Sequence, residues 1–265
     1  MSDTPAAAPQ VTGKMFLFAR PVLLNPTQHA DLGVDPQERP FDFAANTRAL
    51  PLTASEIPAA CHDYPIVFAS MDQPVPLAVV GIIDDRNLFV DDNGKWEKIA
   101  YIPGYVRRYP FGAAYDPEND RFAVVLDADY PGLRPGGENR LFENGETTQF
   151  TQEAVDFTRN YENDRKMTDA LGQLLKKFDL LAPQAGKYTP RAGGEPIPFA
   201  EYVGVDEKKL NELDDEKFME LRKSGALPLV YAQLLSMGNW RRIFSRRADR
   251  FNLTEENAFK PLVTS

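Results

Sequence analysis

The sequence predicts an α+β fold, with strands in the first half of the chain and helices in the second. Two observations carry this prediction. The first half contains short runs rich in Val, Ile, Phe and Tyr, and these runs are bounded by Pro, Gly, Asn or Asp. From Thr151 to Leu181 the chain has no proline, and its apolar residues recur at three- and four-residue steps. No internal repeat is visible, so we expect both halves to form one cooperative unit.

The predicted strands follow one another after a short, polar N-terminal segment. Residues 1–13 are small and polar and predict a disordered tail. The apolar runs then predict strands at 15–20, 21–25, 64–70, 76–83, 87–91, 98–103, 107–115 and 121–127. Residues 44–62 are punctuated by proline and are expected to form a loop with one helical turn. The segment 116–120 contains Pro117 and predicts a hairpin turn between the last two strands.

A second hairpin is predicted at Asp91-Asp-Asn-Gly-Lys95, where Asn93-Gly94 suits positive φ angles. The acidic residues before the glycine also raise the question of a calcium loop. An EF-hand loop with Gly94 at its sixth position would place Phe89 first and Ala100 twelfth, and neither residue is a carboxylate ligand. The sequence therefore favours a turn over a calcium site.

The second half begins with a long amphipathic helix at 151–181, for which Thr151 is the expected N-cap. Residues 182–198 predict a flexible connector, and residues 199–205 a short strand. Asp206 and Asp214 are expected to cap two short helices, the second of which ends at Gly225. A last helix is predicted over 226–251.

Composition limits the classes of function. The chain has 265 residues, 43% of them hydrophobic, and a net charge of -9 with a pI of about 4.9. Phosphate backbones repel an acidic protein, so nucleic-acid binding is not expected. Cys61 is the single cysteine, which excludes an intramolecular disulfide and suits a reducing compartment. We see neither a secretory signal nor an apolar run of membrane-spanning length, and expect a cytoplasmic location.

With these segments in place, the chain resembles the bacterial SapC family from about Val22 to Arg250. The resemblance rests on the stretches "LLNPTQHADLGV", "HDYPIVFAS", "PLAVVGIIDDRNLFVDDNGKWEKIAYIPGYVRRYPF", "LFENGE" and "VDEKKLNELDDEKFMELRKSGALPLVYAQLLSMGNWRRI". It implies a single SapC-like domain at 14–250, β-rich at 14–150 and helical at 151–250, followed by a C-terminal tail at 251–265.

The resemblance implies a cellular setting for the protein but no particular chemical reaction. The family is named after a protein linked to a bacterial surface layer, and no catalytic residues are agreed for it. Its members often accompany TonB-dependent outer-membrane receptors and flavin-dependent halogenase-like proteins. The expected function is therefore a non-catalytic accessory protein of cell-envelope or outer-membrane uptake systems, with another protein as partner and no cofactor. The alternatives are a metal- or ligand-binding enzyme or halogenase auxiliary, and a surface-layer component exported by a signal-less route.

Arginines are the first candidates for contact with a partner. Arg242, Arg246 and Arg250 share one face of the last predicted helix, and Arg107, Arg108 and Tyr109 form a smaller basic and aromatic segment. Guanidinium groups bind carboxylate or phosphate, although the same residues could instead be salt-bridged within the chain.

For the enzyme alternative, the candidates are His29, Asp31, Asp127 and Asp129. A His-x-Asp pair can ligate a metal or act as an oriented general base, and Asp127 and Asp129 fall on one side of a predicted strand. These four side chains can share one ion only if the fold brings them together.

Overall fold

The computed structural model describes residues 14–116, 121–189, 193–254 and 257–262, and it confirms the α+β class. The predicted tail at 1–13 and the predicted turn after Asp116 lie outside these residues. The chain divides into two compact units that alternate along the sequence. The first unit comprises the residues up to Phe43 and Arg108–Glu162, and the second comprises Ala44–Arg107 and the chain from Asn163 onward.

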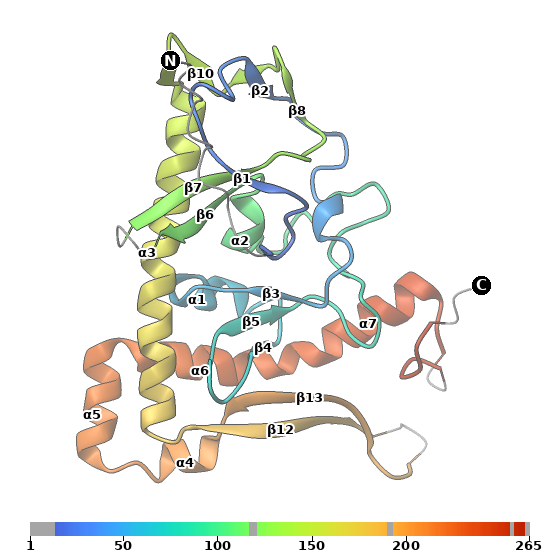
Figure 1. Cartoon of the computed structure of the whole chain (residues 1–265). Helices are drawn as coiled ribbons and strands as arrows, with labels where there is room; N and C mark the ends of the chain where they lie inside the picture. The colour runs from blue at the N-terminus through green and yellow to red at the C-terminus, as the bar shows by residue number, and fades with distance from the viewer. Residues whose placement is uncertain (1–13, 117–120, 190–192, 255–256, 263–265) are drawn as a thin grey trace. The chain divides into compact units, whose positions relative to one another are not determined.

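The first unit is built from small antiparallel sheets (Figure 1). One has the order β1-β7-β6, with strands β1 (Pro21–Leu23), β6 (Phe111–Asp116) and β7 (Arg121–Asp127). Another has the order β8-β2-β9, with strands β2 (Leu32–Val34), β8 (Leu133–Pro135) and β9 (Asn139–Arg140). The hairpin of β10 (Phe142–Glu143) and β11 (Glu146–Thr147) turns at Asn144-Gly145, where both φ angles are positive. The buried core includes Val34, Phe111, Leu126, Leu141 and Phe142.

The second unit contains a five-stranded antiparallel sheet with the order β12-β13-β4-β5-β3. Its strands are β3 (Ala49–Pro51), β4 (Ile66–Phe68), β5 (Pro76–Val79), β12 (Leu181–Tyr188) and β13 (Ile197–Val205). The early strands meet the late ones at the pair of Val203 with Phe68. The core beside this junction includes Phe68, Leu175, Leu181, Val205, Leu221 and Val230.

Helices follow the predicted layout in the second half of the chain. The 29-residue helix α3 (Gln149–Lys177) begins in the first unit and ends in the second. It is followed by α4 (Glu207–Asn211), α5 (Asp215–Ser224), α6 (Ala226–Ser236), the 3-10 helix η3 (Met237–Asn239) and α7 (Trp240–Phe251). Figure 1 shows α6 and α7 as a nearly continuous rod. The short helices are η1 (Asp42–Ala44), η2 (Ala54–Glu56), α1 (Ile57–Ala60) and α2 (Gly104–Arg107).

The predicted caps are confirmed for two of three helices. The Asp206 carboxylate accepts from the N–H groups of Lys208 and Lys209, and the Asp214 carboxylate accepts from that of Lys217. The prediction for α3 was wrong, because this helix begins two residues earlier than Thr151. The Thr148 hydroxyl accepts from the Thr151 N–H at 3.3 Å, whereas the Thr151 hydroxyl is buried and donates to the Leu141 carbonyl.

Several predicted strands are absent from the described residues. Residues 15–20 form a turn in which Leu17 has a φ of 66°, and residues 98–103 contain no strand. The run 87–91 pairs only through an isolated bridge between Val90 and Trp96. The predicted connector at 182–198 was also wrong, since most of its described part belongs to β12 and the start of β13. Apolar runs alone do not make strands where no neighbouring backbone is available for pairing.

Gly225 ends α5 and precedes α6 with a φ of 79°, a left-handed conformation that costs any residue with a Cβ about 1–2 kcal/mol. Because space is open around it, the Gly225→Ala substitution should destabilise the protein through backbone strain alone. We expect the free energy of unfolding in urea to fall by about 1 kcal/mol. Gly238→Ala is the matched control, since Gly238 also has open space but no positive φ. Equal effects of the two substitutions would contradict this account.

Candidate functional site

The three predicted contact arginines of α7 lie on one face, as their spacing predicts, and each has partners within the second unit. Arg246 is 3.1 Å from Glu97 and lies over the Phe89 ring at 4.4 Å. Arg250 is 2.8 Å from Asp92 and donates to the Asn87 and Val90 carbonyls. These contacts tie α7 to the segment 87–97.

The third arginine, Arg242, donates to the His62 carbonyl and lies 3.7 Å from Asp63. The side chains of Arg242, Arg246 and Arg250 are 46%, 25% and 26% exposed, so part of each side chain remains accessible to solvent. The arginine face is thus both internally paired and open to a partner.

An open cleft of about 720 Å³ is lined by Arg246, Asp249 and Arg250 of α7 and by residues of the segment 88–98, and we call it the α7 cleft. Phe89 and Trp96 form its buried apolar floor. Its charged walls comprise Asp91, Asp92, Lys95, Glu97, Lys98, Arg246, Asp249 and Arg250. Because Phe89 and Trp96 are almost fully buried, the accessible surface of the cleft consists mainly of its charged walls.

The turn that forms one wall of the α7 cleft is the predicted Asn-Gly turn. Gly94 has a φ of 67°, and the Asp91 carboxylate accepts from the N–H groups of Asn93 and Lys95 at 2.9 and 2.8 Å. The Lys95 N–H is the main reason that the pKa of Asp91 is lowered. Asp91 therefore organises the turn with its side chain, as an Asx turn does.

Arg247, on the opposite side of α7 from solvent, was not among the predicted site residues. Its side chain is 1% exposed and lies 2.6 Å from Asp84. It also donates to the Ala258 and Lys260 carbonyls, while the Asp84 carboxylate accepts from the Leu262 N–H. This buried pair therefore fastens residues 258–262 to α7.

The residues of the predicted segment Arg107–Tyr109 each have different partners within the chain. Arg107 donates to the Ile102 carbonyl and to the Tyr101 hydroxyl. Arg108 is buried and forms a 2.9 Å ion pair with buried Glu162. Tyr109 stacks on Phe43.

Tyr109 also donates its hydroxyl to Asp127, and burial, reinforced by this carboxylate, raises the pKa of Tyr109. Arg107, Arg108 and Tyr109 thus stabilise different parts of the local structure.

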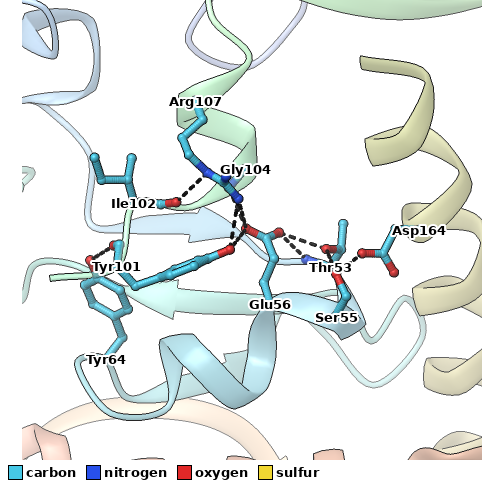
Figure 2. Close-up of polar contacts among 9 residues, drawn as sticks. All are labelled: Thr53, Ser55, Glu56, Tyr64, Tyr101, Ile102, Gly104, Arg107 and Asp164. Atoms are coloured by element: carbon cyan, nitrogen blue, oxygen red, sulfur yellow. Dashed lines mark hydrogen bonds and ion pairs between the residues drawn. The ribbon is translucent and has the colours of Figure 1, made fainter. Parts of the chain in front are cut away.

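A second polar cluster surrounds Glu56 in the second unit, and Figure 2 shows its carboxylate pointing at Thr53, Tyr101 and Gly104. One oxygen accepts from the Thr53 N–H and hydroxyl at 2.8 and 2.9 Å. The other accepts from the Gly104 N–H and, at 3.1 Å, from the Tyr101 hydroxyl. Arg107 is 4.0 Å from this second oxygen.

The Glu56 carboxylate is 5% exposed. Two of its hydrogen bonds come from Thr53 within the turn at 53–56, and the other two join this turn to Tyr101 and Gly104. Burial, followed by the nearby charge of Glu56, raises the pKa of Tyr101 to about 12. The Tyr101 hydroxyl is therefore a hydrogen-bond donor at neutral pH and not a base. The sequence Thr53-Ala-Ser-Glu56 has capping-box spacing, a signal that we did not use in the sequence analysis.

The residues of the metal alternative, His29, Asp31, Asp127 and Asp129, all belong to the first unit. His29 is 8% exposed, burial lowers its pKa, and its Nδ1 accepts from the Asn25 N–H at 3.1 Å. The Asp31 side chain is 92% exposed and lies 3.7 Å from Arg140. These two side chains therefore face different surroundings.

The two aspartates at the end of β7 share Arg20 as a partner. Buried Asp127 accepts from the N–H groups of Ala19 and Arg20, and exposed Asp129 pairs with Arg20. Among the residues that the structure describes, no three His, Cys, Asp or Glu side chains lie close enough to share a metal ion. Asp127 instead joins the residues before β1 to the end of β7.

The fold and the α7 cleft define an α+β protein with an open, charged surface site beside its last helix. The chain belongs to the SapC family, because residues 24–243 match the model of that family. None of the curated proteins and none of the solved structures matches it. Within the described part of the chain, every helix is too short or too polar to cross a bilayer.

Proposed function

We propose that this SapC-family chain is a non-catalytic accessory protein that binds another protein through the α7 cleft. The observation that carries the proposal is the position of Arg246 and Arg250, which are partly exposed on the cleft wall next to the aromatic floor of Phe89 and Trp96. Phe89 and Trp96 are almost fully buried, so the accessible arginines carry this argument, and arginine is among the residues that contribute most to protein interfaces.

The energetics of the ion pairs also support binding at this cleft. Arg246 faces Glu97, whose side chain is 40% exposed, and an ion pair of this kind contributes about 0–1 kcal/mol. A carboxylate of a partner can therefore replace Glu97 at little cost. Arg247 and Arg108, by contrast, are buried in their ion pairs and are not available to a partner.

The resemblance to SapC proteins supplies the proposed setting. We infer that the partner belongs to a cell-envelope or outer-membrane uptake system, because the genes of this family are found beside those of TonB-dependent receptors. The overall negative charge is compatible with a protein partner whose surface is locally mixed or basic.

The proposal is tested by affinity capture of the tagged full chain from its own organism at low salt, followed by native mass spectrometry. We expect a stoichiometric protein partner that is lost with Arg246→Glu, because the new carboxylate would repel Glu97 and a partner's acidic group. Arg165→Glu is the matched control, since Arg165 forms an exposed ion pair with Asp169 on α3, away from the cleft.

The result is interpretable only for variants with wild-type circular dichroism and urea midpoints. If folded Arg246→Glu still captures the partner, the α7 cleft is not the contact site. The same conclusion follows if Arg165→Glu loses the partner to the same extent as Arg246→Glu. Capture of the chain without any protein partner would contradict the accessory function itself.

A further inference from the structure

A cluster of aromatic rings lies on another side of α7, where β12 ends and residues 257–262 pass by. Phe259 stacks on Tyr188 with ring centroids 4.6 Å apart and contacts Phe244 at 4.8 Å. Phe199 of β13 approaches Phe244 edge-on at 4.5 Å. Gly186 permits this arrangement, because a Cβ at that position would lie 2.5 Å from the Phe199 ring. The rings therefore hold one another in fixed orientations.

These rings line a second cleft of about 460 Å³, which we call the aromatic cleft. Tyr188, Phe244 and Phe259 are half-buried around it, and Ala248 and Leu253 add aliphatic surface. The volume falls within the usual range for small-molecule sites, about 300–1,000 Å³. The aromatic cleft shares none of its lining residues with the α7 cleft.

Arg241 is the one charged residue among the described residues that line the aromatic cleft, and its surroundings differ from those of most arginines of α7. Arg242, Arg246, Arg247 and Arg250 all have carboxylate or carbonyl partners. The exposed Arg241 side chain has no hydrogen bond or ion pair with any residue that the structure describes. Its guanidinium is thus available to an anion from solution, in a protein whose net charge is -9.

We propose that the aromatic cleft binds a small planar aromatic molecule that carries one anionic group. The ring of the ligand packs among Tyr188, Phe244 and Phe259, and its anionic group pairs with Arg241. Carboxylate and phosphate share this chemistry, because both accept two parallel N–H donors from a guanidinium. The proposal does not depend on the proposed partner at the α7 cleft.

The features of the cleft favour a small molecule over a polypeptide. Among the described residues that line the cleft, one cation beside three rings matches one anionic group on one flat molecule, whereas the α7 cleft presents several charges of both signs. Aromatic pairs in offset or edge-on geometry contribute beyond the area that they bury, and the half-buried rings retain faces for such contacts.

The test uses 2-naphthoate as a probe, titrated at low salt into the full chain and followed by calorimetry. We expect saturable binding with one site per chain. Arg241→Gln should weaken it about tenfold or more, because charge-assisted hydrogen bonds are lost. Arg222→Gln is the matched control, since Arg222 is likewise exposed and its side chain has no partner among the described residues. We expect this control to bind as the wild type does.

Three further probes separate the contributions of the anionic group and of the flat ring to binding. The neutral 2-naphthamide should bind weakly and equally to the wild type and to Arg241→Gln, and cyclohexanecarboxylate should bind weakly because it lacks a flat ring. Comparison of 1-naphthyl phosphate with 2-naphthoate identifies which anionic group the cleft prefers, and either preference supports the proposal. Absence of saturable 2-naphthoate binding, or binding that Arg241→Gln leaves unchanged, would overturn it.

Discussion

Arg247→Met is expected to lower the free energy of unfolding by about 3 kcal/mol, one of the two largest effects that we predict for this chain. Methionine fills much of the volume of the arginine stem, so the loss measures the polar contacts more than the packing. The substitution leaves the Asp84 carboxylate without its guanidinium and deprives the Ala258 and Lys260 carbonyls of their donors. Urea unfolding followed by tryptophan fluorescence measures the change.

The control for Arg247→Met is Arg165→Met, which breaks an exposed ion pair of α3 and should change stability by no more than about 0.5 kcal/mol. Hydrogen exchange gives a second measurement, because residues 258–262 should lose protection only in Arg247→Met. A change below about 1 kcal/mol, with unaltered protection, would show that the pair does not hold this segment.

The same pair predicts a pH dependence. Burial alone would raise the pKa of Asp84, but hydrogen bonds from Arg247 and the Leu262 N–H outweigh it and lower that pKa. A lowered pKa in the folded state stabilises the protein above the unfolded value of about 3.9, and this stabilisation is lost as the pH falls through the folded value. Arg247→Met should therefore lose less stability than the wild type on acidification below about pH 4.

Glu56→Gln should lower the free energy of unfolding by about 3 kcal/mol. One carboxylate oxygen accepts from the N–H and hydroxyl of Thr53, and the other accepts from Gly104 and Tyr101. A glutamine amide has only one acceptor oxygen, so its NH₂ group must face one of these pairs of donors. Whichever way the amide turns, one buried N–H, that of Thr53 or that of Gly104, then loses its acceptor and faces the NH₂ group. The hydroxyl beside it, that of Thr53 or Tyr101, must rotate to accept from this NH₂ group.

Glu220→Gln is the control for Glu56→Gln, since Glu220 is 48% exposed and pairs with Lys177 at the surface. Its effect on stability should stay within about 0.5 kcal/mol. Tyr101→Phe removes only one of the four donors and should cost about 1 kcal/mol. If Glu56→Gln and Glu220→Gln have equal effects, Glu56 does not organise the 53–56 and 101–107 segments.

Local signals in the sequence were sufficient for much of the fold. The predicted runs 64–70, 76–83 and 121–127 contain β4, β5 and β7, because they combine β-branched and aromatic residues with turn residues at their ends. Asp206 and Asp214 cap their helices because such capping depends only on residues two or three positions away.

The strand β12 could not be predicted from such signals. Its sequence contains Pro183 and Gly186, which favour loops, and the strand exists because it pairs along its length with β13. The glycine that weakens its strand propensity is the residue that admits the Phe199 ring. Pairing with β13 thus stabilises a strand that the local preferences of Pro183 and Gly186 disfavour.

In the candidate site, too, the sequence predicts features that depend on nearby residues but not the partners that are distant along the chain. The spacing of Arg242, Arg246 and Arg250 is sufficient to place them on one helix face. Their partners Asp63, Glu97 and Asp92 are distant in the sequence, and only the fold brings them to α7. Arg247 lies four residues from both Ile243 and Phe251, so the same spacing rule also places it on the apolar face of the helix, where it is buried.

The order of strands in the five-stranded sheet also has a consequence for biosynthesis. Strands β3, β4 and β5 are translated first, and β12 and β13 follow roughly 100 residues later, which corresponds to about 5–20 s on a ribosome. During this interval the edge of β4 that later pairs with β13 has no strand beside it. The nascent chain therefore carries an exposed sheet edge, and a chaperone that shields such edges would act before Val203 emerges.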